Sequence, residues 1–276
     1  MIYQGSKERI SKDLLPYIQN CIDSNHFDVY VEPFVGGANM IDKVKCHYRI
    51  GIDQNHWVIE LLKYMRDNPD LPLAPEDCSF ELYAKVRESY NKGNKDYSDV
   101  EKAMIGYFAS YGGRFYDGGY GRDRTGKRNI YKERVAYAKK QAPLLSDISF
   151  IEGNYQETCK ALTVLHNSEN CLIYCDPPYA NTKQYGVTFN SESFYAWVKE
   201  LSKKYFVLIS EYYMPSSFVK IWSKERKVMQ KSDRTIAEKA EEGLYTLKDG
   251  LYYQWLRKQN GLIKEKHSDE ETDNFR

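Results

Sequence analysis

The chain has 276 residues, of which 42% are hydrophobic and 14% aromatic. This length is enough for a full core in one large domain, or in one domain that carries an insertion. The formal net charge is only +1, so overall charge points to no class of partner, and only local clusters of charge are informative.

Six cysteines lie along the chain without any Cys-x-x-Cys spacing. This pattern excludes a typical zinc site and is typical of buried thiols in a reducing compartment. No apolar run approaches the 18 residues of a membrane span, and the start of the chain does not read as a signal peptide. We therefore expect a cytoplasmic protein with no metal and no membrane partner.

The N-terminal region begins with a glycine turn in Tyr3-Gln4-Gly5-Ser6-Lys7, followed by a predicted helix over Glu8–Asn20. Lys7 could meet a carboxylate or a nucleic-acid phosphate, or it could be an ordinary solvated side chain. A strand over Phe27–Val31 comes next, because polar and apolar residues alternate there.

This strand leads into Glu32-Pro33-Phe34-Val35-Gly36-Gly37 and a predicted helix over Ala38–Lys45. Paired glycines after a strand let a ligand approach the backbone closely, although they also occur in plain turns. The motif is not Gly-x-Gly-x-x-Gly, and an acid such as Glu32 binds phosphate poorly. It therefore favours a ligand that carries an ammonium group over a dinucleotide.

The next strand, Tyr48–Ile52, ends in Asp53, and a helix is predicted over Asn55–Asp67. An acid at the end of the second strand commonly binds ribose hydroxyls, but Asp is also a good helix cap. Asp53 lies about 20 residues after Phe34, the spacing of a ribose-binding acid, which favours that interpretation.

Three prolines in residues 68–77 mark a boundary, and helices are predicted over Glu76–Tyr90 and Val100–Ser110. In residues 111–140, nine basic residues outnumber three acids, with glycines and aromatic rings interleaved. This composition predicts a nucleic-acid groove, and the alternative is a solvated loop followed by a basic helix. The candidate DNA contacts are Arg114, Tyr120, Arg122, Arg124, Lys127 and Arg128.

A strand over Ile148–Glu152 precedes Gly153-Asn154-Tyr155-Gln156 and a predicted helix over Glu157–Leu165. Asn154 and Tyr155 are placed to meet a purine, although Tyr155 could simply pack against that helix. A second polar and aromatic motif follows the next strand of the chain.

That strand, Ile173–Cys175, must end at Asp176-Pro177-Pro178-Tyr179, because proline cannot donate to a sheet. A carboxylate and a free carbonyl can accept both hydrogens of an amino group, and an aromatic face can stack on a heterocycle. This set suits the amino group of a nucleobase swung out of its duplex. The alternative is a turn in which Asp caps and Tyr packs.

The C-terminal region continues the alternation with a predicted helix over Ser191–Lys203 and a strand over Tyr205–Ser210. Further predictions are a strand or short helix over Phe218–Trp222, strands over Arg226–Met229 and Leu244–Leu256, a hairpin turn at Asp249-Gly250, and a charged loop over Ser232–Glu242. Strands that alternate with helices indicate an α/β fold with a mostly parallel sheet.

Taken together, the Tyr3–Lys7, Glu32–Gly37 and Asp176–Tyr179 motifs resemble the Dam-type (D-P-P-Y) adenine-specific DNA methyltransferases. Phe108–Arg124 is similar to that family's aromatic, Arg-containing stretch ahead of its DNA-reading hairpin, and the resemblance extends to about Leu256. It implies the S-adenosylmethionine-dependent methyltransferase fold, with a seven-stranded, mostly parallel, Rossmann-like sheet. The implied organisation is a catalytic domain in residues 1–74 and 144–260, an inserted target-recognition domain in 75–143, and a disordered tail in 261–276.

The resemblance also implies an activity, namely methyl transfer from S-adenosylmethionine to the N6 amino nitrogen of a flipped adenine in double-stranded DNA. Further expectations are a cognate restriction endonuclease as partner and, beside a cytoplasmic location, association with the nucleoid. The implied catalytic residues are Asp176, Pro177, Pro178 and Tyr179. The implied cofactor-binding residues are Tyr3, Lys7, Glu32, Phe34, Gly36, Gly37, Asp53, Asn154, Tyr155 and Asp176.

Two alternatives stay open on the sequence. One is an amino methyltransferase that acts on cytosine or on RNA. The other is a catalytically inactive DNA-binding protein with the same fold, against which the intact Asp-Pro-Pro-Tyr motif argues.

Overall fold

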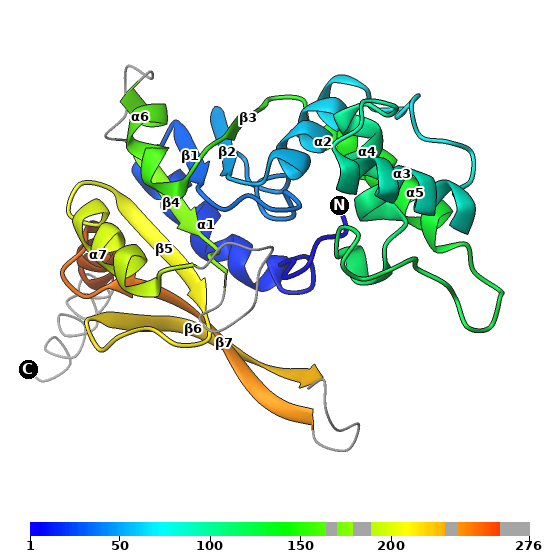
Figure 1. Cartoon of the computed structure of the whole chain (residues 1–276). Coiled ribbons are helices and arrows are strands. Elements are labelled where there is room, and N and C mark those ends of the chain that lie inside the picture. The colour runs from blue at the N-terminus through cyan, green and yellow to red at the C-terminus, as the bar shows by residue number, and fades with distance from the viewer. Residues whose placement is uncertain (164–169, 179–188, 230–236, 260–276) are drawn as a thin grey trace, which may run out of the picture. The chain divides into compact units, whose positions relative to one another are not determined.

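The computed structural model describes residues 1–163, 170–178, 189–229 and 237–259 (Figure 1). The chain divides into two compact units, Met1–His166 and Asn167–Arg276. Its seven strands are ordered β3-β2-β1-β4-β5-β7-β6 in one sheet. The predicted α/β class and the seven-stranded sheet are therefore confirmed.

The first unit contains three parallel strands, β1 (Val29–Glu32), β2 (Tyr48–Asp53) and β3 (Ile148–Glu152). All four residues of β1 are buried, as expected for a parallel strand that is covered on both faces. The register pairs Glu32 with Gly51 and Asp53 with Glu152. The side chains that follow these strands therefore leave the sheet at its carboxyl edge.

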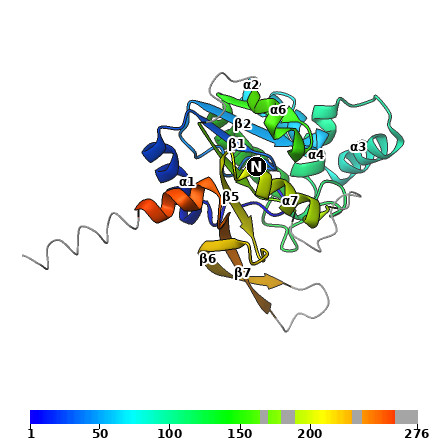
Figure 2. The same ribbon diagram turned by 90° about the vertical axis from the view of Figure 1, so that its left-hand side faces the viewer.

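Among its described residues, the first unit also contains six helices, several of which lie to one side of the strands (Figure 2). Most of them begin at a side chain that caps the first turn. The side chain of Asn55 accepts hydrogen bonds from the backbone N–H groups of Trp57 and Val58 in the first turn of the helix. Ser98 and Glu101 form a capping box. The helices are α1 (Ser11–Asn25), α2 (His56–Asp67), α3 (Phe80–Lys92), α4 (Asp99–Phe108), α5 (Ile130–Gln141) and α6 (Thr158–Thr163), with 3₁₀ turns η1 (Tyr111–Gly113), η2 (Ala142–Leu145) and η3 (Tyr155–Glu157).

The helix predicted over Ala38–Lys45 is wrong, because this segment forms successive turns. Ala38 has a φ of 56° and Gly36 a φ of 46°, and this left-handed conformation cannot start a right-handed helix. The N–H of Lys43 bonds to the carbonyl of Met40, three residues back. The segment that follows β1 is therefore a run of turns and not a helix.

The second unit contains β4 (Cys171–Cys175), β5 (Phe206–Glu211), β6 (Phe218–Met229), β7 (Ala237–Leu247) and α7 (Ser191–Leu201). β4 and β5 are parallel, whereas β7 runs antiparallel to both β5 and β6. β6 and β7 form a long hairpin (Figure 1). The buried side chains of α7, Phe194, Val198 and Leu201, share one face of the helix.

Several predictions for the C-terminal region are corrected. Phe218–Trp222 and Arg226–Met229 belong to one strand, β6, and residues 237–242 of the predicted loop belong to β7. Leu244–Leu256 is a strand only to Leu247, and residues 251–259 are helical. Asp249-Gly250 therefore leads into a helix rather than a hairpin, because the buried ring of Tyr252 packs against Phe206.

Three expectations fall outside the described residues. They concern Tyr179, the end of the helix predicted over Glu157–Leu165, and the tail over 261–276. The boundaries of the target-recognition domain, 75–143, stay a prediction.

Candidate active site

The glycine turn after β1 is packed against the N-terminal segment of the chain. A Cβ atom added to Gly36 would lie 2.8 Å from Cε1 of Tyr3, and one added to Gly37 would lie 2.8 Å from Cβ of Tyr3. Any larger residue would displace Tyr3. The two glycines therefore allow Tyr3 to cover the turn, and this groups Tyr3, Gly36 and Gly37 as the resemblance implied.

Gln141, at the end of α5, also fixes this turn. Its side-chain amide donates to the carbonyls of Gly37 and Ala38, at 3.1 Å each, and to Oδ2 of Asp42 at 2.9 Å. Gln141 is not among the residues predicted from the sequence, and no local signal could have revealed it, because it lies about one hundred residues from its partners along the chain.

Asp53 links the glycine turn to the start of α2. Its Oδ2 accepts the N–H of Gly36 at 3.0 Å, and its Oδ1 accepts the N–H of Asn55 at 2.9 Å. Burial raises the pKa of the Asp53 carboxyl to about 6, although both backbone hydrogen bonds oppose the rise. Because Asn55 caps α2, Asp53 is not the cap, and its carboxylate still has acceptor positions for hydroxyl groups.

Two aromatic rings form a wall near these groups. Phe34 and Tyr155 stack with ring centroids 5.2 Å apart and an interplanar angle of 28°. Asn154 caps η3, because its Oδ1 accepts the N–H of Gln156 at 3.1 Å, and its side chain is exposed. The two segments predicted to meet a ligand, after β1 and after β3, are therefore in contact.

Lys7 and Glu32 are both buried, with 2% and 3% of their surface exposed. The hydroxyl of Tyr30 donates to Oε1 of Glu32 at 2.8 Å. Burying a charge is costly unless it is paired or hydrogen-bonded, so the fold must hold both side chains against polar partners. The interpretation of Lys7 as an ordinary solvated side chain is excluded.

His56, which the sequence analysis also missed, joins three elements of the first unit. Its Nδ1 lies 2.8 Å from Oε2 of Glu152 in β3, and its Nε2 lies 3.3 Å from Oδ2 of Asp99 in α4. The hydrogen bond to Glu152, with a smaller contribution from Asp99, raises the pKa of His56. The two acids are remote in sequence, so spacing gives no sign of this cluster.

In the second unit, Asp176 directly follows β4, whose five residues are all buried. Cys175 pairs with Ile209 of β5, so Asp176 leaves the sheet beside Ser210. Pro177 is buried, and Asp176 and Pro178 are partly exposed. The predicted strand and the position of its end are confirmed.

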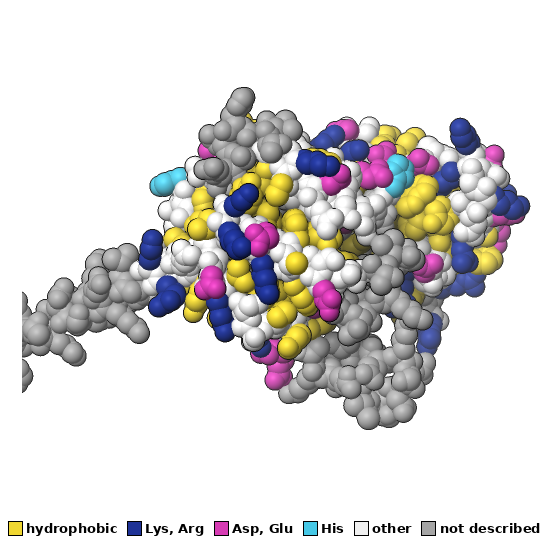
Figure 3. Space-filling model, turned by 60° about the vertical axis from the view of Figure 1, so that its left-hand side comes forward, with side chains coloured by type: hydrophobic (Ala, Val, Ile, Leu, Met, Phe, Trp, Pro, Cys, Tyr) yellow, Lys and Arg dark blue, Asp and Glu magenta, His cyan; other side chains and the backbone are white. Residues whose placement is uncertain are grey.

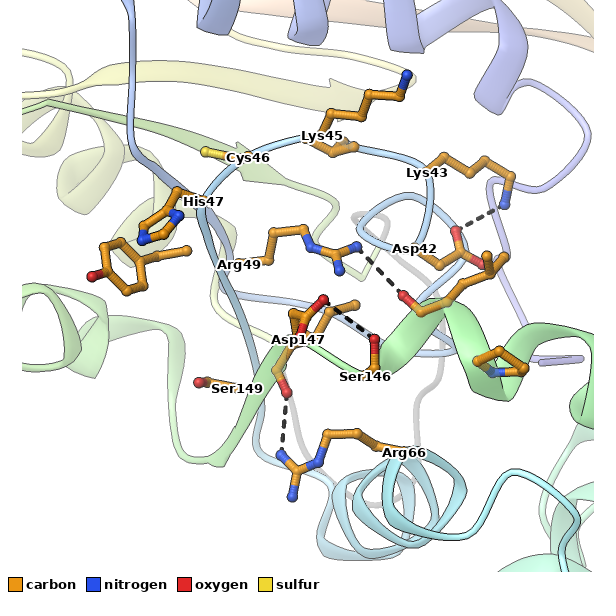
Figure 4. Close-up of a pocket in the computed structure, with 15 residues that line it drawn as sticks. Asp42, Lys43, Lys45, Cys46, His47, Arg49, Arg66, Ser146, Asp147 and Ser149 are labelled. Atoms are coloured by element: carbon orange, nitrogen blue, oxygen red, sulfur yellow. Dashed lines mark hydrogen bonds and ion pairs between the residues drawn. The ribbon is translucent and has the colours of Figure 1, made fainter.

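A cavity of about 920 Å³ lies at the opposite, amino edge of β2 and β3 (Figure 4). Its basic side chains include Arg49 and Arg66, and each donates to the protein's own backbone. Arg49 bonds to the carbonyl of Ile41, and Arg66 bonds to the carbonyl of Ile148, both at 3.1 Å. Arg49 thus joins β2 to the turn at Ile41, and Arg66 joins α2 to β3, so the cavity is not our candidate active site.

The basic residues of the predicted nucleic-acid region differ in how firmly they are held. The carboxylate of Asp123 organises a turn by accepting the backbone N–H groups of Lys127 and Arg128 at 3.0 and 3.2 Å. Arg128 forms a two-bond ion pair with Glu133. Arg124 and Lys127 are exposed on this turn.

Arg122 is held differently, by the faces of two rings. Its guanidinium carbon lies 4.8 Å from the ring centroid of Phe80 and 5.4 Å from that of Tyr120. The Tyr120 hydroxyl donates to the carbonyl of Cys78 at 2.5 Å. Arg114 is partly exposed next to η1.

Basic and acidic side chains are interspersed on the face of the molecule in Figure 3, so charge alone does not mark a DNA surface there. Within the described ranges, no group of three or more His, Cys, Asp or Glu residues could hold a metal ion. A membrane-spanning helix is likewise not found among the helices that the structure describes.

Comparison with known proteins gives a family. The model of the D12 class N6 adenine-specific DNA methyltransferases matches residues 3–236. The chain is 27% identical over 197 residues to a type II methyltransferase, M.FokI, of Planomicrobium okeanokoites, matching 65% of this chain and 28% of that protein. It is 22% identical over 202 residues to a type II methyltransferase, M.MjaIII, of Methanocaldococcus jannaschii, matching 64% of this chain and 67% of that protein.

The chain therefore spans less than a third of the Planomicrobium protein and about two thirds of the Methanocaldococcus protein. Among solved structures, an rRNA methyltransferase of Streptomyces viridochromogenes, aviRa, aligns with a TM-score of 0.40 and 10% identity. That alignment covers 87% of this chain and 84% of the other.

Proposed function

Because the chain belongs to the D12 class N6 adenine-specific DNA methyltransferase family, we propose that it methylates the N6 amino nitrogen of adenine in double-stranded DNA. S-adenosylmethionine would supply the methyl group from its sulfonium sulfur and would leave as S-adenosylhomocysteine, and the methylated amino nitrogen would lose one proton. The observation that carries the proposal is the place of Asp176-Pro177-Pro178, directly after a fully buried strand. Function in open α/β sheets concentrates at such strand ends.

The adenine amino nitrogen is a poor nucleophile, because its lone pair is delocalised into the ring. The carboxylate of Asp176 and the carbonyl of Pro177 offer two acceptors for its two hydrogens. Accepting both favours a tetrahedral nitrogen whose lone pair is free to attack. Tyr179, the last residue of the motif, would stack on the flipped base. Positioning and electrostatics then supply the rate, and no covalent enzyme intermediate is needed.

The cofactor would be held mainly by residues of the first unit. The Asp53 carboxylate would accept ribose hydroxyls, since it is fixed by two backbone N–H groups and keeps further acceptor positions. Phe34 and Tyr155 would offer an aromatic wall for the adenine ring, with Asn154 beside it. The methionine end would meet the covered glycine turn, together with the following residues of the first unit: Tyr3, Lys7, Glu32, Gly36 and Gly37.

The DNA backbone would be bound by the basic turn that we call the Asp123 turn, residues 122–128. All four of its cations are exposed, but Arg128 is paired with Glu133 and Arg122 lies on two rings, so we assign the phosphate contacts to Arg124 and Lys127. Phosphate contacts need cations that are accessible on an ordered frame. Arg114 and Tyr120 would flank this surface.

A cognate restriction endonuclease acting on the same DNA sequence would be the partner of such an enzyme. The designation of the relatives as type II methyltransferases supports this expectation. The DNA would be reached in the cytoplasm or on the nucleoid.

Tritium transfer tests the proposed activity directly. The protein is incubated with tritium-labelled S-adenosylmethionine and either duplex DNA or RNA, and the nucleic acid is digested and its nucleosides separated. We expect the label in N6-methyldeoxyadenosine. Label in a cytosine nucleoside or in RNA, or no label in any product, would overturn the proposal.

A further inference from the structure

Tyr213 exposes 73% of its surface, a larger fraction than the other exposed large hydrophobic side chains in the described part of the chain. It lies two residues after the end of β5, at Glu211. Because β5 runs parallel to β4 with Ile209 opposite Cys175, the chain leaves the sheet here at the same edge as Asp176. An exposed ring therefore follows the strand next to the Asp-Pro-Pro motif.

Both neighbours of Tyr213 are anchored, Tyr212 by hydrogen bonds to its backbone and Met214 by burial of its side chain. The N–H of Tyr212 donates to Oε1 of Glu211 at 2.8 Å, and the hydroxyl of Tyr245 donates to the carbonyl of Tyr212 at 3.3 Å. Met214, the next residue, is buried. A ring on a fixed backbone loses little conformational freedom when it binds, which makes Tyr213 a better contact than a ring on a loose loop.

We infer that Tyr213 stacks on a DNA base that loses a stacking neighbour when the target adenine leaves the helix. This inference rests on the proposed function, because only extrusion of a base creates such a surface. Extrusion costs the duplex stacking and pairing energy, and that cost is smaller when the base is already mismatched. An aromatic platform tolerates any neighbouring sequence, because every base has a π face.

The test uses short duplexes that contain the site methylated by the wild-type protein, identified beforehand by sequencing. Steady-state methylation is measured for wild type, Tyr213→Ala and Tyr213→Phe, on a matched duplex and on one with a mismatch opposite the target adenine. Tyr48→Ala is the control, since Tyr48 is also exposed, at 47%, but begins β2 at the amino edge. S-adenosylmethionine affinity is measured for each variant by calorimetry.

We expect Tyr213→Ala to lower kcat/KM on the matched duplex by about 5-fold to 150-fold, the range for one lost base–aromatic stack. The loss should shrink severalfold on the mismatched duplex, and Tyr213→Phe should stay within about twofold of wild type, because the ring alone stacks. Cofactor affinity should not change. Tyr48→Ala should match wild type on both duplexes.

Three results would overturn the inference while leaving the proposed activity intact. They are wild-type kinetics in Tyr213→Ala, an equal loss on both duplexes, and a loss in Tyr213→Phe as large as in Tyr213→Ala. The first would mean that the exposed ring serves another partner, such as a protein. Absence of adenine methylation by the wild-type protein would instead contradict the proposed function.

Discussion

The two edges of the parallel strands in the first unit use their polar groups in opposite ways. At the amino edge, Arg49 and Arg66 donate to backbone carbonyls and thereby join β2 to the turn at Ile41 and α2 to β3. At the carboxyl edge, Asp53 accepts two backbone N–H groups, yet its carboxylate keeps acceptor positions and has a raised pKa. A large cavity lies at the first edge, and the groups suited to ligand binding lie at the second.

Cavity volume is therefore a poorer guide to this protein's function than the hydrogen bonds that the polar side chains at each strand end make with the protein itself. A cation whose hydrogens are used by the protein's own carbonyls stabilises the fold. An acid such as Asp53, whose pKa burial raises while its carboxylate keeps acceptor positions, costs stability and is therefore a candidate for function. Asp176 is a candidate on a different ground, its place directly after the fully buried strand β4.

The largest effect is expected at Asp176, whose role would be confined to the reaction step. Asp176→Ala should lower the single-turnover methylation rate by about 100-fold to 1,000-fold or more, the scale for losing one preorganised electrostatic group. Asp176→Asn should be nearly as impaired, because its amide can turn a donor toward the amino group. Equilibrium binding of DNA and cofactor should stay within a few-fold in both variants.

A smaller effect, on cofactor affinity, is expected at Asp53. Asp53→Ala should weaken S-adenosylmethionine binding by about 1–3 kcal/mol, as expected for a lost hydrogen bond to a charged group. Calorimetric titration measures this change, and circular dichroism checks that the fold is retained. An unchanged affinity would remove Asp53 from the cofactor site.

The raised pKa of Asp53 makes this binding pH-dependent. Since the ionised carboxylate accepts hydroxyl hydrogens and its pKa is about 6, affinity should fall as the pH is lowered through 6 and level off above about 7. The decline should approach tenfold per pH unit well below the pKa. Asp53→Asn should show a flat profile over the same range, and a wild-type profile that is equally flat would contradict the role.

In the Asp123 turn, the exposed cations should matter more for DNA than matched cations elsewhere. Replacing both Arg124 and Lys127 with Ala should reduce the slope of log affinity against log salt by about two, one for each lost phosphate contact. Replacing Lys139 and Lys140, which are exposed at the end of α5, removes the same charge and should change the slope less. Filter binding at several salt concentrations compares the two double variants.

The smallest effect on activity is expected at the amino edge. Arg66→Ala should lower the free energy of unfolding by about 1–2 kcal/mol, because the carbonyl of Ile148 loses a charged donor. Urea unfolding measures this loss. Methylation kinetics and cofactor affinity should match those of wild type. A large loss of activity without a loss of stability would contradict this expectation, because it would indicate a functional group at the amino edge.

Much of this arrangement could be predicted because it depends on short stretches of sequence. Two prolines follow Asp176, so the sequence alone shows that β4 ends next to this acid. Likewise, the apolar run of β2 is enough to place Asp53 at the carboxyl end of that strand. The contacts of Gln141 and His56 could not be predicted, because their partners are remote in sequence and meet only in the folded chain. The helix predicted over Ala38–Lys45 failed because composition does not reveal the positive φ of Ala38.

The central claim is that Asp176 acts on the amino group of adenine in DNA. Sequencing the DNA of host cells that lack other adenine methylation, after expression of wild type or Asp176→Ala, tests it most directly. We predict N6-methyladenine at one recurring sequence with wild type and none with the variant, at equal protein levels. Methylation of cytosine by wild type, or undiminished adenine methylation by Asp176→Ala, would contradict the claim.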